Sequence, residues 1–124
     1  MKRILLVAIL LALLCTACGQ PEQAAQPVTV QQVVGHLAAA GVTCQPEDQQ
    51  PHQLGTIEDA ACEANGSRLN LLTFPVGVDA ARWARDAQRL AGGSYVVGAG
   101  WALGTEDRAL ATTIADRIEG ATLI

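Results

Sequence analysis

Basic and aromatic residues are both scarce in this sequence of 124 residues. Lys and Arg together number 8 against 12 Asp and Glu, so the chain lacks the basic surface that nucleic-acid binding requires. The aromatic residues are two Trp, one Tyr and one Phe. A domain of this size with so few large rings has a thin core and would gain stability from a covalent cross-link.

Catalytic motifs are missing as well. The sequence contains no Gly-x-Ser-x-Gly elbow, no His-Glu-x-x-His helix and no phosphate-binding glycine loop. The two histidines fall in ordinary positions, His36 at the edge of a helical apolar face and His52 in a loop beside Pro51. We therefore expect no catalytic residue, no metal site and no cofactor, and we interpret the protein as a non-enzyme.

The N-terminus carries the longest apolar run of the chain. Met1-Lys2-Arg3 supplies positive charge and residues 4–14 are all apolar, which is the pattern of a secretory signal peptide. About 14 apolar residues are available here, whereas a membrane-spanning helix needs about 20. The run is therefore too short for a permanent transmembrane anchor.

Residues 15–19, Cys-Thr-Ala-Cys-Gly, follow this run and resemble the lipobox of bacterial lipoproteins. In that family a cysteine preceded by small residues receives a diacylglycerol thioether and becomes the mature N-terminus. The resemblance implies lipidation of Cys18 and removal of residues 1–17 as a signal peptide. Cys15, where the family usually has Leu, is a poorer acceptor because two bulky leucines precede it. A plain cleaved signal peptide and a signal retained in the membrane are the alternatives.

The charge of the mature chain bears on how it would be anchored. Removal of residues 1–17 leaves 107 of the 124 residues, with six Arg, no Lys and twelve acidic residues, a formal net charge of −6. This charge argues against a polybasic patch at the membrane surface, so acyl chains would be the anchor. The expected location is the extracytoplasmic face of the cell membrane. Gly19 stands where an inner-membrane retention signal has Asp, so in an envelope with two membranes we expect the outer one.

Cys44 and Cys62 are the two cysteines outside the signal region. An exported chain enters an oxidising compartment, so we expect them to form a disulfide. Closing a loop of about 18 residues should stabilise the fold by roughly 3 kcal/mol. A zinc or redox site is the alternative, but zinc needs further Cys or His ligands at motif spacing, and redox pairs usually read Cys-x-x-Cys. Only His52 lies in the loop.

The rest of the chain divides into two parts. Residues 18–28 are rich in Gln, Ala and Pro and predict a flexible tether, about 30 Å long at most if it is extended. Residues 29–124 predict a single α+β domain. The spacing of apolar residues predicts three helices, which begin near Thr29, Asp79 and Thr105.

Short strands are predicted around these helices, at residues 42–44, 60–64, 67–74, 95–103 and 121–124. Asn65-Gly66 joins two of them in a hairpin, and Gly98-Ala99-Gly100 turns a second hairpin within the fourth range. The resulting order is α-β-β-β-α-β-β-α-β. Hairpins between helices favour a small antiparallel sheet with about three helices packed on one face.

Two surface features are candidate contact sites. Arg82, Arg85 and Arg89 lie within about 60° of one another on the second helix and could form an anion-binding stripe. Acidic residues three or four positions away favour instead a solvated face of salt bridges. The other feature is Trp101, which follows the Gly-rich turn and is either presented to a partner or packed on a neighbouring helix.

The domain also resembles small, function-unassigned lipoproteins of high-GC Gram-positive bacteria. The resemblance spans roughly residues 30–122 and is carried by Ala61-Cys62-Glu63, by Leu72-Thr73-Phe74 ahead of a helix with Trp83, and by Val96-Val97-Gly98 with Gly100-Trp101. It implies a shared fold and a surface location. It implies no activity.

Three classes of function are compatible with these features. The first, which we favour, is a noncatalytic envelope module that is held to the membrane by its lipid and binds an envelope protein, a peptide or a glycan. The second is a structural or stress-related surface lipoprotein. The third is a cell-wall-active hydrolase or transferase, which is motivated by location alone. Nucleic acid is not an expected partner, because the mature chain is acidic.

Overall fold

The computed structural model describes residues 25–47 and 53–124. The predicted signal peptide, the lipidation site Cys18, most of the predicted tether and His52 lie outside the described residues. The predicted α+β class, with three helices and an antiparallel sheet, is confirmed. The elements of the described residues are α2 (Val30–Ala39), β1 (Asp59–Ala64), β2 (Ser67–Thr73), α3 (Ala80–Ala91), β3 (Ser94–Gly98), β4 (Trp101–Thr105), α4 (Arg108–Arg117) and β5 (Thr122–Leu123).

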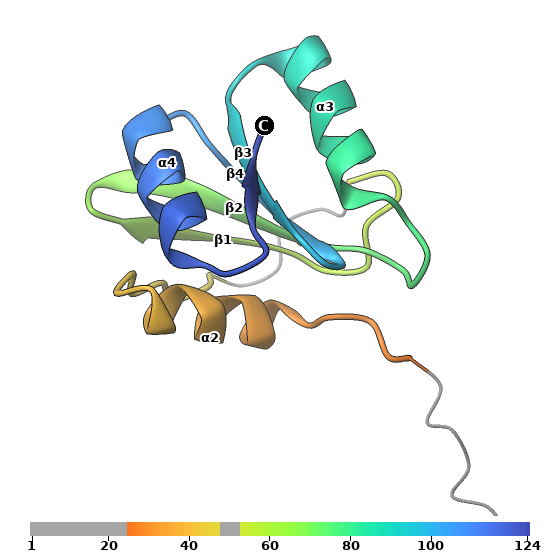
Figure 1. Ribbon diagram of the computed structural model, residues 1–124, viewed down its shortest axis with the longest axis horizontal. Coiled ribbons are helices and arrows are strands. Elements are labelled where there is room, and N and C mark those ends of the chain that lie inside the picture. The colour runs from red at the N-terminus through yellow and green to blue at the C-terminus, as the bar shows by residue number, and fades with distance from the viewer. Residues whose placement is uncertain (1–24, 48–52) are drawn as a thin grey trace, which may run out of the picture.

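The five strands form one twisted sheet in the order β1-β2-β4-β3-β5, in which every neighbouring pair is antiparallel (Figure 1). Both predicted hairpins are present. Asn65 and Gly66 turn the first with φ of 51° and 78°, the left-handed backbone that this tight turn requires. In the second hairpin Gly98 pairs with Trp101, so residues 99 and 100 make the turn. The turn residues thus fix the register of both hairpins.

The helices cover both faces of the sheet, so the prediction that they pack on one face is wrong. Leu71, Val96 and Leu103 lie on one face and pack in the same apolar cluster as the buried residues of α2 and α4. Their neighbours in the strands point the other way, since side chains alternate along a strand. That second set packs with Ala80 and Ala84 of α3.

The handedness of the connections explains this division. The chain passes from β2 to β3 and from β4 to β5, and each of these crossovers skips one strand in the same direction across the sheet. β2 and β4 run in opposite directions because they pair antiparallel. Crossovers between parallel strands are right-handed in nearly all proteins. Two crossovers of the same hand that start from oppositely directed strands place α3 and α4 on opposite faces.

The predicted strand at residues 42–44 does not form. The N–H of Val42, its first residue, is instead used in a hydrogen bond that ends α2. Gly41 has φ of 82°, and its N–H donates to the Ala38 carbonyl at 3.0 Å. The Val42 N–H donates to the Leu37 carbonyl at 2.8 Å. These two bonds are a Schellman motif, and the accompanying contact between Val42 and Leu37 lies in the core.

The predicted disulfide links this segment to the sheet. Cys44 is joined to Cys62 of β1 with Cα atoms 5.6 Å apart, and both side chains are buried. A second contact holds the end of α2, since the Arg117 guanidinium of α4 donates to the carbonyl of the C-cap residue Ala40 at 3.1 Å. The disulfide and α4 therefore fix the end of α2 against the sheet.

The last helix, α4, was expected to begin near Thr105, and its N-cap is Asp107. Its carboxylate accepts the Leu110 N–H at 3.0 Å and the Ser67 hydroxyl at 2.7 Å, so it also ties the first hairpin to this helix. Thr105 instead accepts the Asp107 N–H at 3.1 Å. The Leu110 N–H, with the Ser67 hydroxyl second, lowers the pKa of Asp107 below its ordinary value.

Asp107→Ala should lower the thermal midpoint of unfolding at neutral pH, and the difference from the wild type should vanish in acid. A carboxyl whose pKa is lowered by folding stabilises the fold above its ordinary pKa, near 4, and loses this contribution as the pH falls through the lowered value. Thermal unfolding between about pH 7 and pH 2 checks this. Asp116→Ala, on an exposed residue of α4, is the control. A midpoint difference for Asp107→Ala that is independent of pH would contradict the assignment.

Candidate functional site

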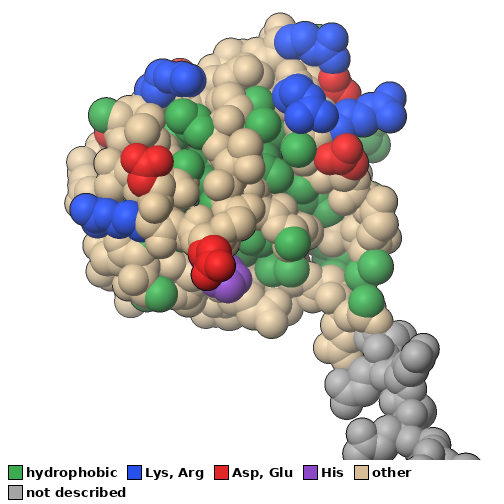
Figure 2. Space-filling view, viewed as in Figure 1, with side chains coloured by type: hydrophobic (Ala, Val, Ile, Leu, Met, Phe, Trp, Pro, Cys, Tyr) green, Lys and Arg blue, Asp and Glu red, His purple; other side chains and the backbone are tan. Residues whose placement is uncertain are grey.

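The three arginines of the predicted stripe are exposed on α3, and Figure 2 shows basic side chains gathered over this helix with acidic ones beside them. Asp86 forms an ion pair with Arg89. The Asp79 carboxylate caps α3 by accepting the Arg82 backbone N–H at 3.0 Å, so it does not pair with the guanidinium. Within the described ranges Arg82 and Arg85 have no ion pair. The face is thus solvated, with one of the predicted salt bridges formed.

Trp101 is buried, so the hypothesis that it is presented to a partner is wrong. Its side chain is 3% exposed and lies in the cluster with α2. The exposed His36 ring of α2 stacks over it with centroids 6.2 Å apart and planes inclined by 21°. Gly98, its cross-strand partner, leaves room for the indole, since a Cβ there would lie 2.3 Å from the ring. Trp101 is therefore a core residue.

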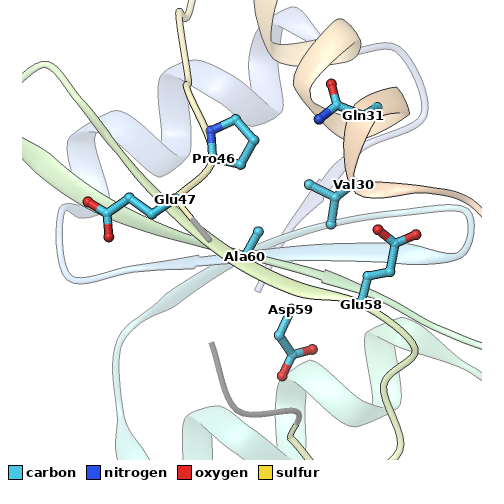
Figure 3. Close-up of a pocket in the computed structure, with 7 residues that line it drawn as sticks. All are labelled: Val30, Gln31, Pro46, Glu47, Glu58, Asp59 and Ala60. Atoms are coloured by element: carbon cyan, nitrogen blue, oxygen red, sulfur yellow. The ribbon is translucent and has the colours of Figure 1, made fainter. Parts of the chain in front are cut away.

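One hollow, of about 220 Å³, lies between the start of α2 and β1 (Figure 3). Val30 and Ala60 face one another inside it. Glu47 and Glu58 stand on opposite sides with their carboxylates apart, and Asp59 points away toward the other face of the sheet. Polar groups do not converge on one point here, so this hollow is the weaker candidate for a binding site.

Asp59 is a buried acidic residue, since its side chain is only 4% exposed. One carboxylate oxygen accepts the Gln53 N–H, and the other has no hydrogen-bond partner among the described residues. Asp59 lies directly opposite Leu72 in the β1 and β2 pair. The carboxylate therefore fixes the loop before β1 over the face of the sheet that α3 also covers.

A second hollow, of about 240 Å³, opens on this same face beyond the end of α3, and we call it the sheet hollow. Its floor is one row of cross-strand neighbours, in which Gly104 pairs with Asn70 on one side and Tyr95 on the other. The walls come from the loop before β1, the end of α3 and the end of β4. Its lining residues are Gln53, Arg68, Asn70, Leu72, Gly92, Gly93, Tyr95, Gly104, Thr105 and Glu106.

Gly104 shapes the sheet hollow because it has no side chain. A Cβ at this position would lie 2.9 Å from Cε1 of Tyr95, so the ring lies directly across the glycine. Trp83 of α3 holds the other side of the ring in an edge-on contact, with centroids 6.1 Å apart. The Tyr95 phenol is thus fixed in orientation by aromatic packing and by a close approach to the backbone.

The sheet hollow carries both signs of charge. Arg68 and Glu106 are exposed at its rim, and Asn70 and Tyr95 are half-buried within it. Burial raises the pKa of Tyr95 above its ordinary value, and the negative charge of Glu106 adds to this effect. The phenol therefore stays protonated at neutral pH and can donate a hydrogen bond to a ligand.

Comparisons with protein-family models, with curated proteins and with solved structures find no match to this chain. In residues 25–47 and 53–124, no helix has the length and apolar character to cross a membrane. The same ranges contain no group of three or more His, Cys, Asp or Glu side chains that could hold a metal ion.

The sequence reasoning missed the sheet hollow entirely. Arg68, Asn70, Tyr95 and Glu106 are spread over two strands and a loop, and only the sheet order brings them together. One local signal was available. Gly104 stands inside a buried strand, where a glycine often marks a close approach of another group.

The surroundings of Tyr95 in the sheet hollow can be tested by titration, because Tyr95 is the only tyrosine of the chain. Its phenol should titrate above the ordinary value of about 10. Glu106→Gln should lower this pKa by removing a negative charge, yet leave it above the ordinary value because burial is the larger cause. Ultraviolet absorbance of the phenolate against pH measures the pKa of Tyr95 in the wild type and in Glu106→Gln. Glu119→Gln is the control at an exposed site. An unchanged titration in Glu106→Gln would contradict the described geometry.

Proposed function

We propose that this protein is a bacterial envelope lipoprotein, held through Cys18 on the extracytoplasmic face of the membrane, and that its domain binds a partner without transforming it. The lipobox-like sequence supports the anchor. The exposed residues 25–27 lead from the domain toward that sequence, which is compatible with attachment at the N-terminus. In an envelope with two membranes, the outer membrane is the proposed location.

The observation that carries the binding role is the polar lining of the sheet hollow. Arg68 and Glu106 offer opposite charges, and Asn70 with the protonated phenol of Tyr95 offers donors and an acceptor between them. Such a set suits a peptide or a glycan of an envelope component better than a purely apolar ligand. A volume of about 240 Å³ lies below the usual range for drug-sized ligands, so the hollow would take one side chain or one sugar unit of a larger partner.

Arg68→Ala tests the binding role. The mature acylated wild type and variant are used to capture partners from detergent-solubilised envelopes, and the amounts retained are compared by mass spectrometry. We expect Arg68→Ala to lose the partner that the wild type retains. Arg85→Ala removes the same charge from an exposed site on α3 and should retain it. Equal retention by Arg68→Ala and the wild type would remove the sheet hollow as the binding site.

A further inference from the structure

The large apolar side chains exposed on the domain are concentrated at one end of the sheet. Val76 is 59% exposed and Val78 is 41% exposed, in the loop between β2 and α3. Ile57 and Leu54, in the loop before β1, are exposed as well. Leu90 is the exception, since it lies near the other end of α3. We call the first four residues the apolar end.

Backbone contacts bring the two loops of the apolar end together. The Ile57 N–H donates to the carbonyl of Thr73, the last residue of β2, at 2.8 Å. The chain then turns through residues 75–78, where the Val78 N–H donates to the Pro75 carbonyl at 3.1 Å. On the α3 side, the Trp83 indole N–H donates to the Leu54 carbonyl at 3.2 Å. Both loops therefore lie beside the end of β2.

The N-terminal segment leaves the domain at this same end. The Phe74 N–H donates to the Gly100 carbonyl at 3.1 Å, which places the turn between β3 and β4 beside the start of the exposed loop. Val28 lies against this turn, with Cγ2 3.0 Å from the position of a Cβ on Gly100. Figure 1 shows the N-terminal segment, the loop before α3 and the turn between β3 and β4 on one side of the molecule.

We propose that the apolar end docks on the lipid bilayer, an inference that rests on the lipid anchor proposed above. Val28 lies ten positions after Cys18 in the chain, so it can lie at most about 33 Å from the acylated cysteine. Residues 75–78 carry no charge, and the mature chain is acidic. The contact is therefore an apolar insertion into the headgroup region and not an electrostatic attraction to anionic lipid.

Trp83 provides a native reporter of this docking. It is half-buried, its ring centroid lies 5.3 Å from that of Phe74, and its ring reaches within 4.0 Å of a Cβ position on Gly55. The experiment reconstitutes the mature acylated protein in zwitterionic phosphatidylcholine vesicles and measures Trp emission with and without lipids brominated near the glycerol end of the acyl chains. Flotation of the vesicles reports the anchor separately.

Wild-type emission should fall in the brominated vesicles. Val76→Ser/Val78→Ser should lose most of this quenching while it still floats with the vesicles. Leu90→Ser, which removes an exposed apolar side chain from the far end of α3, should be quenched like the wild type. Wild-type protein that floats but is not quenched, or a double variant quenched to the same extent, overturns the docking and leaves the anchor standing. Protein that does not float overturns both.

Discussion

Trp101→Ala should lower the free energy of unfolding by about 3–5 kcal/mol, the usual cost of truncating a buried Trp. The indole is 3% exposed and occupies the core between β4 and α2, so truncation leaves a cavity that a small domain cannot easily close. For a domain of about 100 residues this corresponds to a fall in the thermal midpoint of about 12 °C or more. Chemical denaturation followed by circular dichroism measures the change.

Gly98→Ala tests the same packing from the other strand. A Cβ on Gly98 would lie 2.3 Å from the indole, so the ring has to move, and we expect a loss of about 1–3 kcal/mol. The loss should largely disappear in a Trp101→Ala background, because the atoms that clash are then absent. Gly35→Ala in α2 is the matched control, since a Cβ there meets nothing within 4 Å and Ala favours the helix. A Gly98→Ala variant as stable as Gly35→Ala would contradict the packing of Trp101.

Removing the disulfide should have the second largest effect. Cys44→Ala/Cys62→Ala is expected to lower the free energy of unfolding by roughly 3 kcal/mol, a large share of the 5–15 kcal/mol typical of small domains. The bond is the covalent link between the end of α2 and β1, so hydrogen exchange should accelerate more in α2 than in the central strands.

Reduction provides the control for this variant. Dithiothreitol should lower the thermal midpoint of the wild type and leave that of the double Ala variant unchanged. Both sulfurs are buried, so reduction should become rapid only when the domain opens. A wild-type midpoint that dithiothreitol does not change, once mass spectrometry shows two free thiols, would contradict a stabilising cross-link.

Local patterns predicted the elements of this fold better than their arrangement. The Asn65-Gly66 turn and the start of the first helix near Thr29, which is its N-cap, follow from the backbone preferences of single residues. The face on which a helix packs has no such local signature. It depends on the order of strands in the sheet, which no local pattern encodes, so the prediction that α3 packs on the same face as the other two helices is wrong.

The same limit applies at individual residues. Trp101 follows a Gly-rich turn, a pattern that is compatible with an exposed ring and with a buried one. The strand register decides between them, because it places Trp101 opposite Gly98 and against α2. Val42 has strand-like neighbours, but its N–H is used by the end of the helix. The row of Asn70, Gly104 and Tyr95 in the sheet hollow exists only once three strands are paired.

The lipid anchor is the central claim, because both the location and the membrane docking depend on it. Intact-mass analysis of protein extracted from membranes tests it directly. We expect a chain that begins at Cys18, carries the added mass of a diacylglyceryl group and lacks two hydrogens through the disulfide between Cys44 and Cys62. A mass that retains residues 1–17, or one that begins at Cys18 or later without a lipid, would contradict the account.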